Sequence, residues 1–286
     1  MNFLLKSYLL ILIILVSNQA IAGWVIAEVS SDKFGNKQYQ TTFIQNNMIR
    51  FENEATVAII NLKTGNIILL FDEYKLYWQG SIKEFKENTL DVYEQKLNNI
   101  IITGNSSQKI AAQNLITKLR EQNETVNNDS IAKFKIQIDK TTVIENIAGF
   151  NAYKYNIAID DSLIESIWVT DSINPYRDID IESMVSFTNE LIPGDNENSI
   201  EGSPEYLNLI KEGLAVKSQE INPQGGFFTT VVTGVLETNI KDELFLPPPN
   251  FQKTQLAEII LIVETNSGKP NRNQEFNKAQ KESIYD

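Results

Sequence analysis

Short runs of apolar and β-branched residues, separated by turn-forming residues, dominate the first part of the chain after residue 22. Six such runs predict strands in close succession, at residues 24–29, 38–44, 48–52, 56–60, 67–71 and 76–79. The separators contain Gly and Asn, which supply the positive φ angles that tight hairpin turns need. A series of hairpins predicts an antiparallel meander rather than a parallel α/β sheet.

The apolar period changes further along the chain. Between residues 106 and 121 the residues Ile110, Ala111, Leu115 and Leu119 recur at helical spacing, which predicts one amphipathic helix of about four turns. Strands are predicted again at residues 133–139, 153–160, 163–170, 215–221 and 227–239, and helices at residues 179–191 and 204–214. Ser203 is placed to cap the last of these helices, with Pro204 at its first position. Residues 255–265 fit either a strand or a short helix.

No linker-like segment divides these elements into two halves. We therefore expect a single α+β domain over residues 23–265, in which a curved antiparallel sheet packs around helices. Residues 266–286 are polar, and we expect them to form a disordered tail.

The first 22 residues have the pattern of a secretory signal peptide. Lys6 precedes an apolar run at residues 9–16, and the small residues Ala20 and Ala22 stand just before Gly23. The apolar run is shorter than the roughly 20 residues that cross a bilayer. The pattern predicts cleavage between Ala22 and Gly23 and a periplasmic or secreted protein.

The composition narrows the classes of function. The chain has no Cys and no His, which removes disulfides, the usual general base, the usual zinc ligand and the common nucleophile pairs. We therefore expect a protein that is not an enzyme and holds no metal or cofactor. Residues 23–286 carry 24 Lys and Arg (25 less Lys6) against 37 Asp and Glu, a net charge of −13. This charge argues against nucleic-acid partners and against anionic membranes, since both repel an acidic surface.

Short motifs resemble an exported bacterial family of unassigned activity. Residues 147–155 read IAGFNAYKY and residues 167–170 read IWVT; residues 48–51, 70–72, 75–78 and 244–247 add supporting matches. The pattern resembles the family known as domain of unknown function 4412, although Ala152 stands where many members have Cys and Phe150 where Tyr is usual. That family is similar in plan to the LolA/LolB-like periplasmic carriers. The resemblance implies a curved antiparallel β half-barrel packed over two or three helices, with an apolar cavity for acyl chains.

Five aromatic residues are candidates for the lining of such a cavity: Phe51, Phe71, Trp78, Tyr155 and Trp168. The alternative is that they pack in an ordinary core, which large aromatic residues also dominate.

Two acidic segments could either bind calcium or have a structural or solvent-exposed role. Asp178, Asp180 and Glu182 could hold calcium if they shared one face of a strand, but an acidic helix start explains them better. Residues 195–201 have no complete calcium-loop spacing and are expected to form a solvated loop.

The sequence thus favours a periplasmic, non-catalytic protein that binds a hydrophobic ligand such as a lipid or an acyl chain. The alternative is an envelope protein that binds another protein, with a filled core and no small ligand. A hydrolase that works with two carboxylates is a third and more distant hypothesis.

Overall fold

The computed structural model describes residues 22–54, 56–124, 135–191, 200, 203–221 and 226–266. The predicted signal peptide, apart from Ala22, and the predicted tail, apart from Asn266, lie outside the described residues. The acidic segment 195–201 also lies outside them, except for Ile200.

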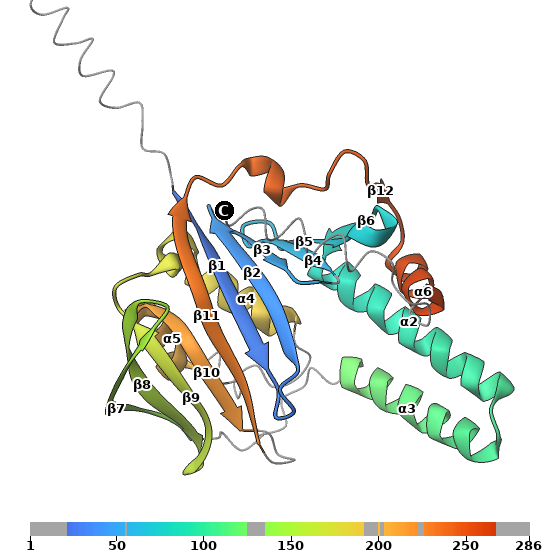
Figure 1. The fold of residues 1–286 in the computed structure, drawn as a ribbon. Coiled ribbons are helices and arrows are strands. Elements are labelled where there is room, and N and C mark those ends of the chain that lie inside the picture. Colours follow the sequence, from blue (N-terminus) through green and yellow to red (C-terminus); the bar gives the residue numbers. More distant parts are fainter. Residues whose placement is uncertain are drawn as a thin grey trace, which may run out of the picture.

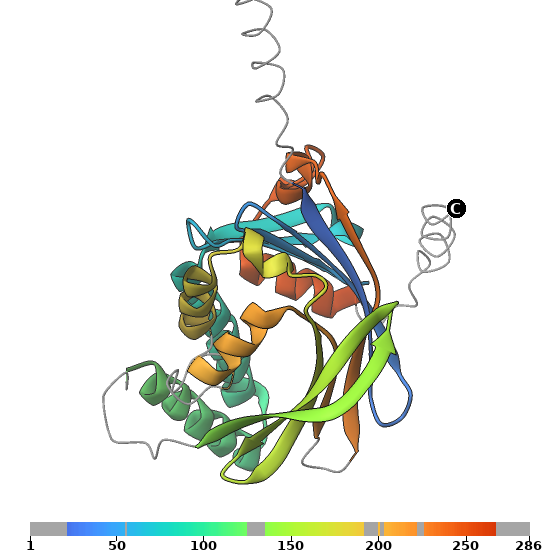
Figure 2. The same ribbon diagram turned by 90° about the vertical axis from the view of Figure 1, so that its left-hand side faces the viewer.

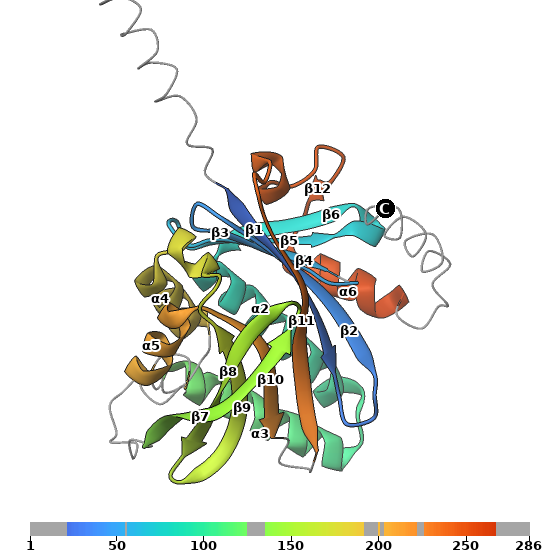
Figure 3. The ribbon, with the colours of Figure 1, turned by 60° about the vertical axis from the view of Figure 1, so that its left-hand side comes forward.

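A single sheet organises the described part of the chain (Figures 1 and 3). Its twelve strands are β1 (Gly23–Ser31), β2 (Lys37–Gln45), β3 (Met48–Glu52), β4 (Val57–Asn61), β5 (Asn66–Phe71), β6 (Leu76–Ser81), β7 (Ile136–Ile147), β8 (Phe150–Ile159), β9 (Ser162–Thr170), β10 (Leu214–Ile221), β11 (Phe227–Thr238) and β12 (Gln252–Lys253). All neighbours pair antiparallel except β12, which lies parallel to β6. The predicted meander at the start of the chain is confirmed.

The chain builds the sheet in two passes. Strands β1 to β6 lie side by side in chain order, and the chain then crosses to the opposite edge and returns through β7 to β11. The two passes meet where β11 pairs with β1, with Gly23 opposite Thr238. The sheet stays open, with β7 and β12 at its edges, and it curves around helices (Figure 2).

Five α-helices lie in the described residues, rather than the two or three that the family resemblance implies. They are α2 (Ile82–Thr103), α3 (Ser106–Glu124), α4 (Ile181–Leu191), α5 (Pro204–Glu212) and α6 (Leu256–Asn266), with short 3-10 turns η1 (Asp72–Tyr74), η2 (Pro175–Asp178) and η4 (Asp242–Phe245). Residues 255–265, for which the sequence allowed either a strand or a short helix, form most of helix α6. Asn266 is the last residue of this helix. Leu214, predicted to end a helix, begins β10 instead.

Helix α2 is the main element that the sequence pattern did not reveal. Its 22 residues bury only three side chains, those of Ile82, Val92 and Leu97, so the apolar stripe is thin. Its start nevertheless has a sequence signal. Ser81 caps the backbone N–H of Glu84, and the Glu84 carboxylate accepts a hydrogen bond from the Ser81 N–H, which together form a capping box.

Each face of the sheet has its own core. On the inner, concave face, Ile26, Ile44 and Trp78 pack in one large cluster with residues of α2, α4 and α6. On the outer face, a segment around η4 covers Ile59 and Ile68 with Ile240 and Phe245. The Gln45 side-chain amide fixes this segment, because it donates to the Ile240 carbonyl and accepts from the Ile240 N–H, each at 2.9 Å.

Candidate functional site

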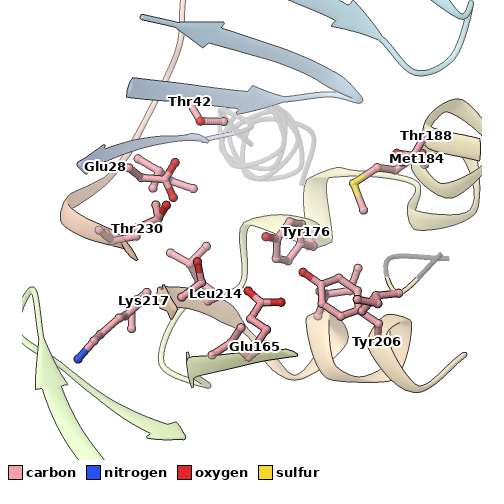
Figure 4. A pocket seen from close by; sticks show the side chains of 18 of the residues that line it. Glu28, Thr42, Glu165, Tyr176, Met184, Thr188, Tyr206, Leu214, Lys217 and Thr230 are labelled. Atoms are coloured by element: carbon pink, nitrogen blue, oxygen red, sulfur yellow. The ribbon is translucent and has the colours of Figure 1, made fainter. Parts of the chain in front are cut away.

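A cavity of about 660 Å³ lies between the concave face of the sheet and the elements η2, α4 and α5 (Figure 4). Its walls come from strands β1, β2, β3, β9, β10 and β11 on one side and from the helical elements on the other. Most of its wall is apolar and includes Ile26, Ile44, Ile49, Phe51, Ile167, Met184 and Val232. The curvature of the sheet leaves this space open, since α4 and α5 do not fill it.

Strand alternation explains which side chains line the sheet side. Residues two apart on a strand share a face, so Ile26 and Glu28 of β1 both point into the cavity. Their partners on β2 are Thr42 and Gln40, and Thr42 in turn lies opposite Phe51 of β3. An apolar floor and a short polar row are therefore adjacent on the same face.

Local capping positions the side chains of the helical wall. Asn174 accepts a hydrogen bond from the Tyr176 N–H at 3.1 Å, and Pro175 begins η2, which turns the Tyr176 hydroxyl into the cavity (Figure 4). Ser203 accepts from the Tyr206 N–H at 3.2 Å at the start of α5, where Pro204 follows as predicted. Tyr206 also lines the cavity.

Two ionisable groups in the cavity are strongly affected by burial. Burial raises the pKa of the Glu28 carboxyl above its ordinary value, although a hydrogen bond from Gln40 partly offsets this effect. Burial raises the pKa of the Tyr176 hydroxyl to about 12, and the nearby Glu28 adds to this rise. Tyr176 is therefore a neutral hydroxyl at physiological pH.

Lys217 also lines the cavity, but its ammonium is engaged elsewhere. Its Nζ lies 3.0 and 2.9 Å from the two carboxylate oxygens of Glu145 and 4.2 Å from the centre of the Trp168 ring. Figure 4 shows the amine pointing away from Glu28 and Tyr176. The positive charge of Lys217 is thus directed out of the cavity.

The five aromatic candidates lie in different places. Phe51 lines the cavity, whereas the other four do not. Phe71 and Trp78 pack in the concave core near α2, where the Trp78 and Phe85 rings are 5.8 Å apart. Tyr155 packs against α5 and donates a hydrogen bond to Glu212 at 2.6 Å. Trp168 is buried, and its Nε1 has no hydrogen-bond partner among the described residues.

The acidic segment at residues 178–182 takes the structural role that the sequence favoured. Asp180 accepts hydrogen bonds from the N–H groups of Glu182 and Ser183 and so caps the start of α4. Burial raises the pKa of Asp178, while a hydrogen bond from Trp24 lowers it. No group of three metal-ligating side chains occurs in the described ranges.

Glu28, Gln40 and Tyr176 are the cavity residues that sequence reasoning missed. Glu28 had a readable signal, because it shares a strand face with Trp24 and Ile26 and so places a carboxylate on an apolar face. Tyr176 had none, since the short turn that carries it has no periodic pattern.

Comparisons with known proteins leave the family open. No family model and no curated protein matches the chain, so membership of the domain of unknown function 4412 family stays a prediction. Solved structures that match include PNGF-II, at 12% identity and a TM-score of 0.36 over 85% of this chain. This chain spans only 33% of the PNGF-II chain.

Two further matches are proteins of Pseudomonas aeruginosa and Nitrosomonas europaea. The MucA/MucB complex of Pseudomonas aeruginosa matches at 7% identity and a TM-score of 0.33, over 81% of this chain and 57% of that one. A LolA superfamily protein from Nitrosomonas europaea matches at 7% identity and a TM-score of 0.24, over 80% and 91%. Nothing about function follows from likeness at this level.

Within the described ranges, no helix combines the length and the apolar character needed to cross a bilayer.

Proposed function

We propose that this protein binds a hydrophobic ligand, with an acyl chain or a similarly extended apolar group, in the cavity between the sheet and helices α4 and α5. The observation that carries the proposal is the cavity itself. Its volume of about 660 Å³ falls within the range of about 300–1,000 Å³ that small-molecule sites occupy. More than half of its lining residues are apolar, and polar side chains such as Glu28, Gln40 and Thr42 stand among them.

Burial of methylene groups would supply the affinity. Each methylene moved from water into an apolar site contributes about 0.8 kcal/mol. A chain of a dozen methylenes therefore gives about 10 kcal/mol before the costs of immobilising the ligand are subtracted. Apolar side chains such as Ile26, Ile167 and Val232 provide this environment without any covalent chemistry.

The remaining sequence features agree with a non-catalytic carrier at the cell envelope. The chain contains no His and no Cys, so the common catalytic bases and nucleophile pairs are missing from it. The signal-peptide pattern of residues 1–22 directs the protein out of the cytoplasm. The alternative of a protein-interaction module predicts a filled core, and the open cavity favours the carrier over that module.

Filling the cavity should weaken ligand binding. Replacing Met184 of α4 by tryptophan places a large ring in the space, and we expect the affinity for a neutral long-chain alcohol such as 1-dodecanol to fall about tenfold or more. Isothermal titration calorimetry on the chain from Gly23 onward measures this affinity. A neutral alcohol tests the apolar walls without any contribution from a charged head group.

The matched control is Leu246→Trp, because Leu246 is 55% exposed and lies outside the cavity. This variant should bind the alcohol as the parent protein does. If the parent protein binds no alcohol, or if M184W and L246W bind it equally, the cavity is not a ligand site.

A further inference from the structure

The charged side chains of the cavity lining favour amphiphiles with a cationic head group over those with an anionic one. Among the described lining residues, three side chains carry a carboxylate and one carries an ammonium: Glu28, Glu165, Glu220 and Lys217. The ammonium of Lys217 is bound by Glu145 and points out of the cavity. The lining thus holds more carboxyl groups than ammonium groups, which disfavours a fatty-acid carboxylate.

We propose that the ligand is an amphiphile whose head group is a protonated amine, held between Glu28 and Tyr176. This inference rests on the proposed function, and it names the class of ligand. The Glu28 carboxylate would accept a hydrogen bond from the ammonium, and the Tyr176 oxygen would accept a second one. The alkyl chain would then lie along the apolar wall that Ile26 begins.

Tyr176 provides a second acceptor near the Glu28 carboxylate. Its hydroxyl points into the cavity (Figure 4), and burial raises its pKa to about 12, so it is a neutral group that can accept a hydrogen bond from a ligand. The charge of Glu28 acts on this hydroxyl, so the two acceptors lie near each other and one donor group of a ligand can serve both. An ammonium has three donors, which is enough to serve both Tyr176 and Glu28.

Glu28 is costly to ionise in the empty cavity. Burial raises its pKa, and Gln40 is the one neighbour whose hydrogen bond lowers it. The other ionisable groups of the lining are Tyr176 of η2, Glu165 of β9, Tyr206 of α5, and Lys217 and Glu220 of β10. An ammonium ligand would favour the ionised form of Glu28. Amine binding should therefore weaken as the pH falls and Glu28 becomes protonated.

Three probes of equal chain length separate the head group from the chain. We expect dodecylamine, held below its micelle concentration, to bind about tenfold or more tightly than dodecanoate, with 1-dodecanol between them. Glu28→Gln should remove most of the preference for the amine over 1-dodecanol. Glu73→Gln, an exposed position on η1 outside the cavity, is the matched control and should change neither affinity.

The outcomes distinguish this inference from the proposed function. If 1-dodecanol binds but dodecanoate equals or exceeds the amine, the head-group inference fails and the cavity remains a hydrophobic site. An unchanged amine preference in E28Q also overturns it. If none of the three probes binds, the proposed function fails as well.

A second inference comes from the hairpin of helices α2 and α3, and it does not depend on the cavity. Residues 95–119 contain three lysines and no acidic residue, in a chain whose net charge is −12. The helices pack on each other through Leu97, Ala112 and Ile116. We call residues 100–110, which include the turn between the helices, the hairpin tip.

The hairpin tip exposes large apolar side chains. Ile100, Ile102 and Ile110 are 40%, 74% and 60% exposed, and Lys109 lies beside them with its Nζ on the Ile102 carbonyl. Figure 1 shows this turn at the periphery of the molecule, away from the sheet. Apolar side chains flanked by lysines are typical of segments that insert into the headgroup region of a bilayer.

We infer that the hairpin tip docks on an anionic lipid surface. Each lysine near such a surface strengthens partitioning by up to about fivefold, and isoleucines add apolar burial. The net negative charge of the protein predicts repulsion, but charges separated by more than about 8 Å are largely screened at physiological salt. Lys109 is the one charged side chain of the tip itself, so the tip is locally positive on an acidic protein.

Vesicle sedimentation tests the inference. We expect the chain from Gly23 onward to sediment with vesicles containing phosphatidylglycerol and not with pure phosphatidylcholine, and to be released by high salt. Ile102→Asp should reduce the bound fraction about tenfold, whereas Leu236→Asp, at a 59% exposed position on β11, should not. Equal binding to both vesicle types, no binding at low salt, or an unchanged I102D variant would overturn membrane docking. Equal binding to both vesicle types would show that the lysines do not contribute to docking. No binding at low salt would make an acidic protein the next partner to test.

Discussion

Replacing Trp78 by alanine is expected to lower the free energy of unfolding by about 3–5 kcal/mol. Trp78 lies on β6 in the concave core and is only 4% exposed. Its ring packs against Phe85 of α2 and occupies the space beside Gly80, where a Cβ would lie 2.6 Å from the indole. The alanine variant loses this buried area and leaves a cavity where α2 meets the sheet.

Urea unfolding followed by circular dichroism measures the loss. Phe34→Ala is the control, because Phe34 is 78% exposed in the β1–β2 turn, and its replacement should change the stability by no more than about 0.5 kcal/mol. Equal midpoints for the two variants would contradict the packing of α2 on β6. This test examines the position of α2 against β6, which the apolar pattern of the sequence did not predict.

Replacing Gly213 by alanine should also be strongly destabilising, by about 1–3 kcal/mol or more. Gly213 follows α5, and a Cβ built there would lie 1.8 Å from the carbonyl oxygen of Thr170. The neighbouring Leu214 pairs with Thr170 in the sheet and lines the cavity. The variant must therefore move β10 away from β9, and this movement should also weaken ligand binding.

Gly234→Ala on β11 is the matched control for this change. A Cβ at Gly234 meets nothing within 4 Å, so the alanine fits without a clash. We expect its stability to equal or slightly exceed that of the parent protein, because alanine restricts the unfolded chain. Thermal unfolding of both variants, with calorimetric titration of 1-dodecanol, provides the comparison. A G213A variant as stable as G234A would contradict the close packing of Gly213 against the Thr170 carbonyl.

Much of the sheet could be predicted from alternation alone. The runs that become β1 to β6 are short, apolar on one face and bounded by Gly and Asn turns, so their pattern has no good helical interpretation. Helix α3 was also found, because its apolar residues recur every three or four positions. Its buried face was not, since Ile110 and Leu115 of the predicted stripe are exposed and Ala112 and Ile116 pack against α2 instead. Helix α2 was missed because its few buried residues are too widely spaced to form a clear stripe.

The candidate site was less accessible to sequence reasoning. Of the five aromatic candidates, Phe51 lines the cavity, while Trp78 and Trp168 lie in the core. An aromatic residue on a strand has the same local pattern whether it faces a ligand or a helix. The carboxylate of Glu28 on an otherwise apolar strand face was the more specific signal.

The sequence by itself determined most of the local elements of this protein, α2 excepted, because periodic patterns depend on neighbours two to four residues apart. Only the tertiary structure decided which faces meet. Gly23 pairs with Thr238 across the whole domain, and the curvature that follows sets how much space α4 and α5 leave above the sheet. A cavity is the volume that distant elements fail to fill, so no local pattern encodes it.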